Sequence, residues 1–241
     1  MSHPLVLIGY DPHEDLSYRV CKESILSHSR RVDVLPIRRA ALESVGLYRR
    51  PLFRENGQDF DGLDGKPFST EFSFSRFLAP ALARLMDRDL VLFCDSDFLF
   101  RAPVEELFDL ADDRYSVQVV KHAYRCDEET KMRAGVAQQA YRRKLWSALM
   151  LMQVSRCRLT PFQVNTMPGS WLHGFGWLND ADIGSLPMAW HWVQRHSPED
   201  VAAKAVHFTL GTPDVAGYEA DKYADEWLSV AWRVDGKEGE E

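Results

Sequence analysis

The sequence predicts an α/β fold with a mostly parallel sheet, and three short stretches carry this prediction. Residues 5–9 are an apolar run that ends in a glycine, residues 32–37 (V-D-V-L-P-I) have the pattern of a second strand, and residues 90–94 are apolar without interruption. Runs of this length, bounded by turn residues, are typical of buried strands. Between the first two runs, apolar residues recur at helical spacing: Leu16, Val20, Cys21, Ile25 and Leu26. The order strand, helix, strand favours parallel pairing, because parallel strands need such a crossover connection.

The length of the chain, 241 residues, suits one large α/β domain. Hydrophobic residues make up 45% of the chain and charged residues 27%, a balance typical of folded globular proteins. The sequence contains no internal repeat and no linker-like segment. We therefore expect one domain over residues 1–235, followed by a disordered acidic tail over residues 236–241.

Two different segments separate the second and third predicted strands. Residues 46–69 are rich in glycine, proline and aspartate, which predicts a long surface loop. Residues 72–86 are mostly apolar and predict a helix. Pro80 should kink or divide this helix, because proline lacks the amide hydrogen that a continuous helix needs.

The second half of the chain has a less regular pattern. Residues 103–110 predict a helix with a proline in its first turn, and residues 115–120 predict a strand. Residues 121–144 have no clear period, whereas residues 145–154 have the composition of a core segment. Residues 167–184 are rich in Gly, Trp, Asn and Asp, which is typical of a loop-rich region at a functional site.

The charge of the chain disfavours one class of partner. The net charge is −7, from 36 acidic and 29 basic residues, so the protein as a whole repels nucleic-acid phosphates. We expect no nucleic-acid partner. Some basic residues do cluster, and we interpret them as solvated surface residues: Arg30-Arg31, Arg38-Arg39, Arg49-Arg50 and Arg142-Arg143-Lys144.

The cysteines and the amino terminus indicate the compartment. Cys21, Cys94, Cys126 and Cys157 are widely spaced and form no C-x-x-C pair, which favours a reducing environment. The apolar run of residues 5–8 is too short for a signal peptide or a membrane span. We therefore expect a cytoplasmic protein without an integral membrane segment.

The pair Asp95 and Asp97 is the main candidate functional feature. It interrupts an otherwise apolar stretch, and a carboxylate in such surroundings requires a compensating partner. Side chains two residues apart in an extended segment point to the same side, so both carboxylates can bind one hard cation. In a parallel α/β sheet, ligands bind beyond the carboxyl ends of the strands, where this pair would lie. The position suits a metal-bound diphosphate.

Two other pairs have the same spacing, Asp59 with Asp61 and Asp180 with Asp182. Both lie in polar, turn-rich surroundings, where aspartate favours turns through its own hydrogen bonds to the backbone. We interpret these four residues as solvated loop carboxylates.

Five segments, in their order along the chain, resemble the glycogenin and lipopolysaccharide galactosyltransferase family of retaining glycosyltransferases, which have a GT-A fold. They match the family's helix before the metal strand, its D-x-D strand, its F-N-A-G-V-L-L strand, its L-P-x-x-W segment and its late histidine motif. The resemblance extends from Ile8 to about Trp227 and is closest to a little-characterised bacterial subgroup. The segments are S-T-E-F-S-F-S-R-F-L-A-P (69–80), F-C-D-S-D (93–97), L-W-S-A-L-M-L (145–151), L-P-M-A-W (186–190) and H-F-T-L-G (207–211).

The resemblance implies a metal-dependent transfer of a hexose from a nucleoside diphosphate sugar, UDP-sugar above all, to a glycan, lipid or protein acceptor. Asp95, Asp97 and His207 would hold Mn²⁺ or Mg²⁺, and the imidazole favours Mn²⁺. Arg76 would contact the donor, unless it forms a surface ion pair with Glu71 or a loop aspartate. The residues that would bind the nucleotide sugar are Tyr10, Asp11, Arg76, Asp95 and Gly211, and the catalytic residues would be Asp95, Asp97 and Arg76.

The sequence also departs from the family pattern. The family has a lysine shortly after the glycine of its late motif, whereas here Gly211 is followed by Thr212-Pro213-Asp214. The family's Q-D pair in the acceptor loop is replaced by Gly176-Trp177. We expect Arg76 to replace the missing lysine as the cation that meets the diphosphate, because arginine can hold two phosphate oxygens at once.

Two alternatives remain. A phosphohydrolase of the haloacid-dehalogenase type would use Asp95 as the nucleophile and Asp97 as the acid, although it would place the pair near the first strand and a threonine where Leu99 stands. A non-catalytic module that binds a sugar nucleotide or glycan would explain the missing lysine and the missing Q-D pair.

Overall fold

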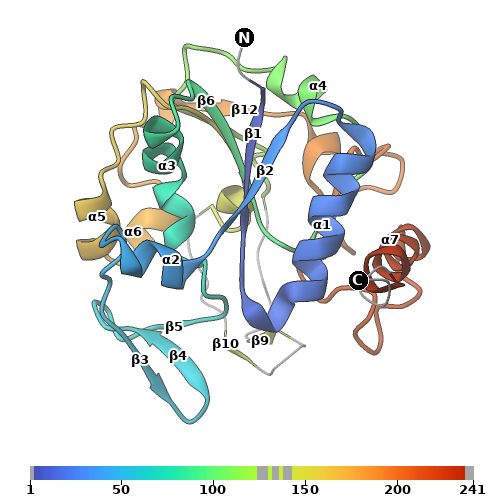
Figure 1. Cartoon of the computed structure of the whole chain (residues 1–241), viewed down its shortest axis with the longest axis horizontal. Helices are drawn as coiled ribbons and strands as arrows, with labels where there is room; N and C mark the ends of the chain where they lie inside the picture. Colours follow the sequence, from blue (N-terminus) through green and yellow to red (C-terminus); the bar gives the residue numbers. More distant parts are fainter. Residues whose placement is uncertain (1–2, 124–129, 132–135, 138–142, 237–241) are drawn as a thin grey trace.

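The computed structural model describes residues 3–123, 130–131, 136–137 and 143–236. Its centre is a six-stranded sheet in the order β12-β8-β11-β6-β1-β2 (Figure 1). β1 pairs in parallel with β2 and β6, as β8 does with β12, whereas β11 is antiparallel to β6 and β8. The predicted α/β fold with a mostly parallel sheet is confirmed. The strands are β1 Leu5–Gly9, β2 Asp33–Ile37, β6 Leu90–Cys94, β8 Val117–Val119, β11 Leu149–Gln153 and β12 Ile183–Ser185.

Helices cover both faces of this sheet (Figure 1). The alternation of β1 explains how the two layers form: Leu5 and Leu7 pack in the cluster that contains α3, whereas Val6 and Ile8 pack in the cluster that contains α1. α7 packs against the outer side of α1. The helices are α1 Asp15–His28, α2 Arg39–Ser44, α3 Ala79–Leu85, α4 Val104–Phe108, α5 Pro161–Thr166, α6 Gly169–His173 and α7 Ala224–Gly236.

A smaller three-stranded sheet has the order β13-β14-β7, and its strand β7 follows β6 in the chain. β14 (Ala205–His207) pairs antiparallel with β7 (Phe98–Phe100) and parallel with β13 (Trp192–Val193). This pairing brings the late part of the sequence to the carboxyl end of the central strand β6.

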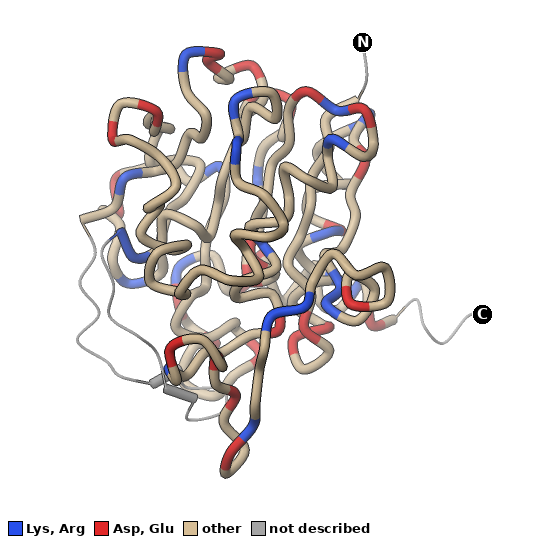
Figure 2. The backbone as a smooth tube through the Cα atoms, turned by 90° about the vertical axis from the view of Figure 1, so that its left-hand side faces the viewer, with Lys and Arg blue, Asp and Glu red and all other residues tan. Residues whose placement is uncertain are grey.

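The predicted long loop of residues 46–69 is wrong in part, because it contains a third small sheet. β3 (Leu52–Glu55) and β4 (Gln58–Asp61) form a hairpin, and β5 (Pro67–Phe68) pairs with β4. The turn of the hairpin is Asn56-Gly57, both with positive φ, the conformation that two-residue hairpin turns prefer. The hairpin projects from the body of the molecule (Figures 1 and 2).

A buried ion pair anchors this hairpin, and it corrects the interpretation of Asp61. Arg50 donates from Nε to Oδ1 of Asp61 at 2.9 Å and also pairs through Nη2 with Oδ2. Its Nη1 donates to the carbonyls of Val164 and Met167 at 2.7 and 2.8 Å. Asp61 is 1% exposed and is therefore not a solvated carboxylate. Asp59, Asp180 and Asp182 are not buried.

Other predicted elements correspond to shorter ones. The apolar stretch of residues 72–86 contains a 3-10 helix, Ser75–Leu78, and then α3, with Pro80 in the first turn of α3. The region of residues 167–184 contains α6 and a 3-10 helix, Asp180–Asp182. Residues 121–144 include the two-residue strands β9 (Thr130–Lys131) and β10 (Val136–Ala137). Cys126, Arg142 and residues 237–241, the end of the predicted tail, lie outside the described residues.

Charged residues of both signs alternate along the described chain (Figure 2). In that part of the protein, the structure contains no helix long and apolar enough to cross a membrane.

Candidate metal and donor site

Asp95 and Asp97 lie in the tight turn between β6 and β7. Both side chains are buried: Asp95 is 8% exposed and Asp97 7%. The spacing suggested an extended strand in which both side chains point to one side. Instead, β6 ends at Cys94, and the turn that follows brings the two carboxylates together. The turn lies at the edge of the sheet where α/β proteins bind ligands.

His207 reaches the same turn from β14. In the pairing of β14 with β7, His207 lies opposite Phe98, whose ring stacks on the imidazole with centroids 4.5 Å apart. The amide of Phe208 donates to the carbonyl of Asp97 at 3.0 Å, which fixes the two segments together. Nε2 of His207 lies 3.1 Å from Oδ1 of Asp97.

Asp95, Asp97 and His207 fit a divalent cation. One ligand atom from each lies within 4.8 Å of the others, and all three residues are buried. Two carboxylate oxygens and an imidazole nitrogen are ligands that divalent ions accept. Buried carboxylates also require compensating positive charge, which a cation supplies. The structure thus brings together the three residues that the sequence proposed as metal ligands.

A second histidine lies behind His207. Nε2 of His191 and Nδ1 of His207 are 2.8 Å apart, within hydrogen-bonding distance. His191 is fully buried, and burial holds its pKa well below the usual range, so its imidazole is neutral. If Nε2 of His207 binds a metal, its proton must lie on Nδ1, which then donates to His191. No pattern in the sequence indicates this contact.

Arg76 lies on the other side of Asp95. It comes from the 3-10 helix before α3, is 6% exposed, and places Nη1 2.8 Å from Oδ1 of Asp95. Nη1 also donates to the carbonyl of Ser147 at 3.1 Å. The surface alternative for Arg76 is wrong, because its side chain is buried and pairs with the buried Asp95, whereas Glu71 pairs with Arg39 at 3.0 Å.

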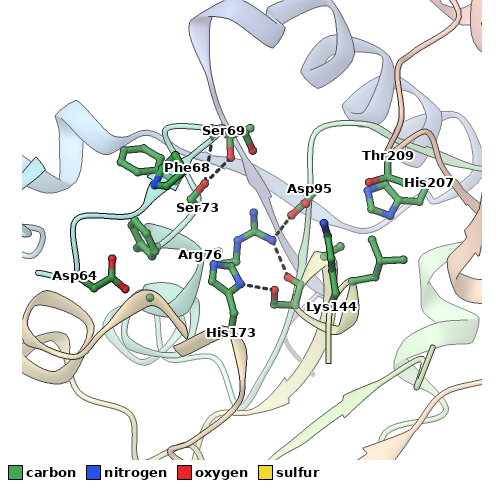
Figure 3. Close-up of a pocket in the computed structure, with 17 residues that line it drawn as sticks. Asp64, Phe68, Ser69, Ser73, Arg76, Asp95, Lys144, His173, His207 and Thr209 are labelled. Atoms are coloured by element: carbon green, nitrogen blue, oxygen red, sulfur yellow. Dashed lines mark hydrogen bonds and ion pairs between the residues drawn. The ribbon is translucent and has the colours of Figure 1, made fainter. Parts of the chain in front are cut away.

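A cavity opens beside Arg76 and Asp95 (Figure 3). Its walls come from the base of the hairpin, the segment before α3, the turn before β11, and α6. His173 and Ser147 form a hydrogen-bonded pair in one wall, with Nδ1 and Oγ 2.9 Å apart. Burial, together with the charge of Arg76, holds the pKa of His173 well below the usual range. The lining residues include Ser69, Thr70, Ser73, Arg76, Asp95, Lys144, Ser147, His173, His207 and Thr209.

Tyr10 and Asp11 do not line this cavity. The carboxylate of Asp11 accepts hydrogen bonds from the amides of His13 and Glu71, both at 2.9 Å, so it caps one turn and fixes a second segment. The hydroxyl of Tyr10 donates to Asp15 at 2.9 Å, and the guanidinium of Arg38 lies 3.6 Å from the centre of the Tyr10 ring. Contact of these two residues with a nucleotide base stays a prediction.

Gly211 lines a second, smaller cavity with Asp97, Thr209 and Glu14. A Cβ at this position would lie 2.7 Å from the ring of Tyr218, so only glycine fits the close packing. Thr209 lines both cavities, which places the Asp95, Asp97 and His207 cluster between them.

Of the residues that line the main cavity, the sequence analysis identified Arg76, Asp95 and His207 but not, among others, Lys144, Ser147 and His173. Lys144 belongs to a basic cluster that we interpreted as solvated, yet it is 8% exposed. Gly176 and Trp177, which replace the Q-D pair, are not among the lining residues of this cavity.

No family model matches the chain. Among solved structures, the glycosyltransferase GlyE of Streptococcus pneumoniae superposes with a TM-score of 0.58 at 16% identity, over 96% of this chain and 60% of GlyE. The bifunctional glycosyltransferase WbbM gives 0.57 at 14% identity, over 95% of this chain and 50% of WbbM. The galactosyltransferase LgtC, in complex with donor and acceptor sugar analogues, gives 0.53 at 16% identity, over 95% of both chains. The chain therefore spans about half to three-fifths of WbbM and GlyE but nearly all of LgtC.

These similarities, with the acidic turn at the end of β6, define a protein with the GT-A glycosyltransferase fold. At the level of sequence, Protein CDI of Arabidopsis thaliana is 40% identical over 233 residues, which are 93% of this chain and 84% of the plant protein. The chain belongs to the family of Protein CDI.

Proposed function

We propose that this protein is a metal-dependent glycosyltransferase that moves a hexose from a nucleoside diphosphate sugar, UDP-sugar above all, to a glycan, lipid or protein acceptor. The observation that carries the proposal is the convergence of Asp95, Asp97 and His207 on one point at the edge of a cavity that Arg76 also lines. A metal site beside a cavity with a buried arginine is suited to a polyphosphate ligand. The GT-A fold supports this proposal.

Asp95, Asp97 and His207 would hold Mn²⁺ or Mg²⁺, and the imidazole favours Mn²⁺. A bound divalent ion would offset the negative charge of the diphosphate leaving group. The protein would orient the ligands: the β7–β14 pair fixes His207 beside Asp97, and Arg76 holds the carboxylate of Asp95.

Arg76 would serve both the metal site and the donor. Its Nη1 is taken by Asp95 and by the carbonyl of Ser147, and its Nε donates to the carbonyl of Phe72 at 3.3 Å. Arg76 lines the cavity, so the part of its fork that these contacts leave would meet a phosphate oxygen (Figure 3). Tyr10, Asp11 and Gly211 remain the proposed contacts to the rest of the nucleotide sugar.

The experiment is incubation of the purified protein with a panel of nucleotide sugars and simple acceptors, with Mn²⁺ or EDTA, followed by mass spectrometry. Metal-dependent transfer of a hexose supports the proposal. Release of inorganic phosphate from phosphate esters without sugar transfer would favour the phosphohydrolase. Tight binding without turnover in any combination would favour the non-catalytic module.

The stereochemistry of the product tests the family resemblance separately. A retaining enzyme leaves the anomeric configuration of an α-linked donor unchanged in the product. NMR of the glycoside distinguishes the two outcomes, and a β-linked product would contradict retention without contradicting transfer.

A further inference from the structure

Lys144 is a buried cation that the proposed machinery does not yet use. It lines the main cavity together with Arg76 and Asp95, and it is 8% exposed (Figure 3). Among the residues that the structure describes, no carboxylate and no carbonyl accepts a hydrogen bond from its ammonium group. A largely buried ammonium group favours an anionic partner, and a ligand in the cavity can supply one.

The backbone around Lys144 is strained on both sides. Arg143 has a φ of 65° and Leu145 a φ of 72°, both in the left-handed region that side chains other than glycine rarely adopt. A leucine in this region is unfavourable, because its Cβ crowds the backbone. Such strain persists only where other contacts hold it, and it is common at ligand sites.

Contacts of Arg143 and Trp146, which flank Lys144 and Leu145, hold the strained turn in place. Nη1 of Arg143 donates to the carbonyl of Gly174 at 2.9 Å, and Nη2 pairs with Asp180. Nε1 of Trp146 donates to the carbonyl of His122 at 3.0 Å. Lys144 thus lies between two anchored residues, and the turn directs its side chain into the cavity.

The balance of charge around the cavity depends on the bound cation. Arg76 pairs with Asp95, and Asp64, the other carboxylate in the lining, lies away from Lys144 (Figure 3). A divalent cation would match the two carboxylates of Asp95 and Asp97. A diphosphate diester carries two negative charges, and it gains a third when the sugar leaves. Arg76 and Lys144 together would match the bound donor, whereas Arg76 alone would leave it under-neutralised.

We propose that Lys144 binds the diphosphate of the donor and so replaces the lysine that is missing after Gly211. It would do so from the turn before β11, and not from the late histidine segment. This inference rests on the proposed function, because it needs a nucleoside diphosphate in the cavity.

The test is calorimetric titration of the full chain with nucleoside diphosphates in the presence of Mn²⁺. UDP, GDP and ADP are the probes, and the one that binds the wild type most tightly is compared with its nucleoside. The variants are Lys144→Ala and Lys144→Arg. Lys204→Ala is the matched control, because it removes one lysine that pairs with Glu106 outside the cavity. Circular dichroism and thermal melting show that each variant is folded.

A hydrogen bond between charged groups contributes substantially to the free energy of binding. Lys144→Ala should therefore lower the affinity for the diphosphate ~10- to 100-fold. Nucleoside affinity should be unchanged, Lys144→Arg should retain most of the diphosphate affinity, and Lys204→Ala should match the wild type. If folded Lys144→Ala binds the diphosphate as tightly as the wild type, or loses nucleoside affinity equally, the role of Lys144 is refuted and the proposed function stands. If the wild type binds none of the three diphosphates, the proposed function fails, and the role of Lys144 with it.

Discussion

Asp97 is the residue on which the metal hypothesis depends most directly. Its carboxylate faces His207, and its backbone carbonyl accepts a hydrogen bond from Phe208, so the main chain stays fixed when the side chain changes. We expect Asp97→Asn to keep the fold but to abolish the gain in nucleoside diphosphate affinity that Mn²⁺ gives the wild type. Calorimetry with Mn²⁺ and with EDTA measures this gain. Equal wild-type affinities under the two conditions would remove the metal from the mechanism.

His191 should influence the metal without touching it. Its ring accepts or donates the hydrogen bond that fixes the tautomer of His207. Loss of such a supporting partner typically lowers metal affinity by roughly 10- to 100-fold. We expect this decrease for His191→Phe in a Mn²⁺ titration. His122→Phe is the matched control, because its ring packs against His191, with centroids 4.6 Å apart, and does not supply the hydrogen bond to Nδ1 of His207. A similar decrease in both variants would show that packing, and not the hydrogen bond, maintains the site.

Arg76 should be required for turnover, in addition to any contribution that its buried pair with Asp95 makes to stability. Loss of a donor to the developing charge of a leaving group typically lowers the rate by ~100-fold or more. We expect this loss for Arg76→Ala at saturating donor. Arg76→Lys should not restore the rate, because one ammonium cannot replace the three contacts of the guanidinium with Asp95, Ser147 and Phe72. Near-normal turnover of folded Arg76→Ala would contradict a catalytic role.

Among the elements, the hairpin depends on one buried ion pair. Arg50 links Asp61 of β4 to the carbonyls of Val164 and Met167 at the end of α5. Removing one partner of a buried pair leaves the other charge uncompensated, which costs about 3–5 kcal/mol. We expect Asp61→Ala to lower the free energy of unfolding by this amount, measured by urea denaturation. The comparison is Asp59→Ala, on the same strand but not buried, which should have an effect of less than about 1 kcal/mol.

The same hairpin is a part of the fold that the sequence analysis did not predict. The apolar strands β1 and β6 have a local signal, because burial on both faces requires unbroken apolar runs. β3 and β4 are short and carry mostly polar side chains, so their composition is that of a loop. Asn56-Gly57 is a local signal of a hairpin turn that we overlooked. The anchor between Arg50 and α5 joins segments that lie far apart in the sequence, and no local pattern predicts it.

At the scale of the whole molecule, the order of the motifs predicted the metal cluster but not the complete cavity. Asp95, Asp97 and His207 carry recognisable patterns, and the pairing of β7 with β14 brings them together. Lys144 follows two arginines in the sequence, a pattern typical of a solvated surface. It points inward because of the left-handed conformation of Arg143 and Leu145, which neither residue type indicates.

The buried histidines should make the whole protein sensitive to acid. Burial lowers the pKa of His122 to about 4, and burial also holds the pKa values of His173 and His191 well below their usual range. Between about pH 6.5, where histidine titrates in an unfolded chain, and about pH 4, the unfolded state therefore binds more protons than the native state. Stability should fall as the pH is lowered through this range, by up to ~1.4 kcal/mol per pH unit for each of these histidines.

Glu71 has the opposite effect on how stability changes with pH. Desolvation raises its pKa, so the native state takes up its proton at a higher pH than the unfolded state, and this favours folding as the pH falls. The effect of three histidines should outweigh that of one partly buried glutamate, so the free energy of unfolding should still fall as the pH is lowered. Urea denaturation across this pH range, in EDTA, measures the slope. His122→Phe should reduce it by about the share of one histidine while leaving stability near neutral pH, where the native imidazole carries no charge, almost unchanged. An unchanged slope in this variant would mean that His122 has the same pKa in the native and the unfolded protein, which contradicts the lowering of its pKa by burial.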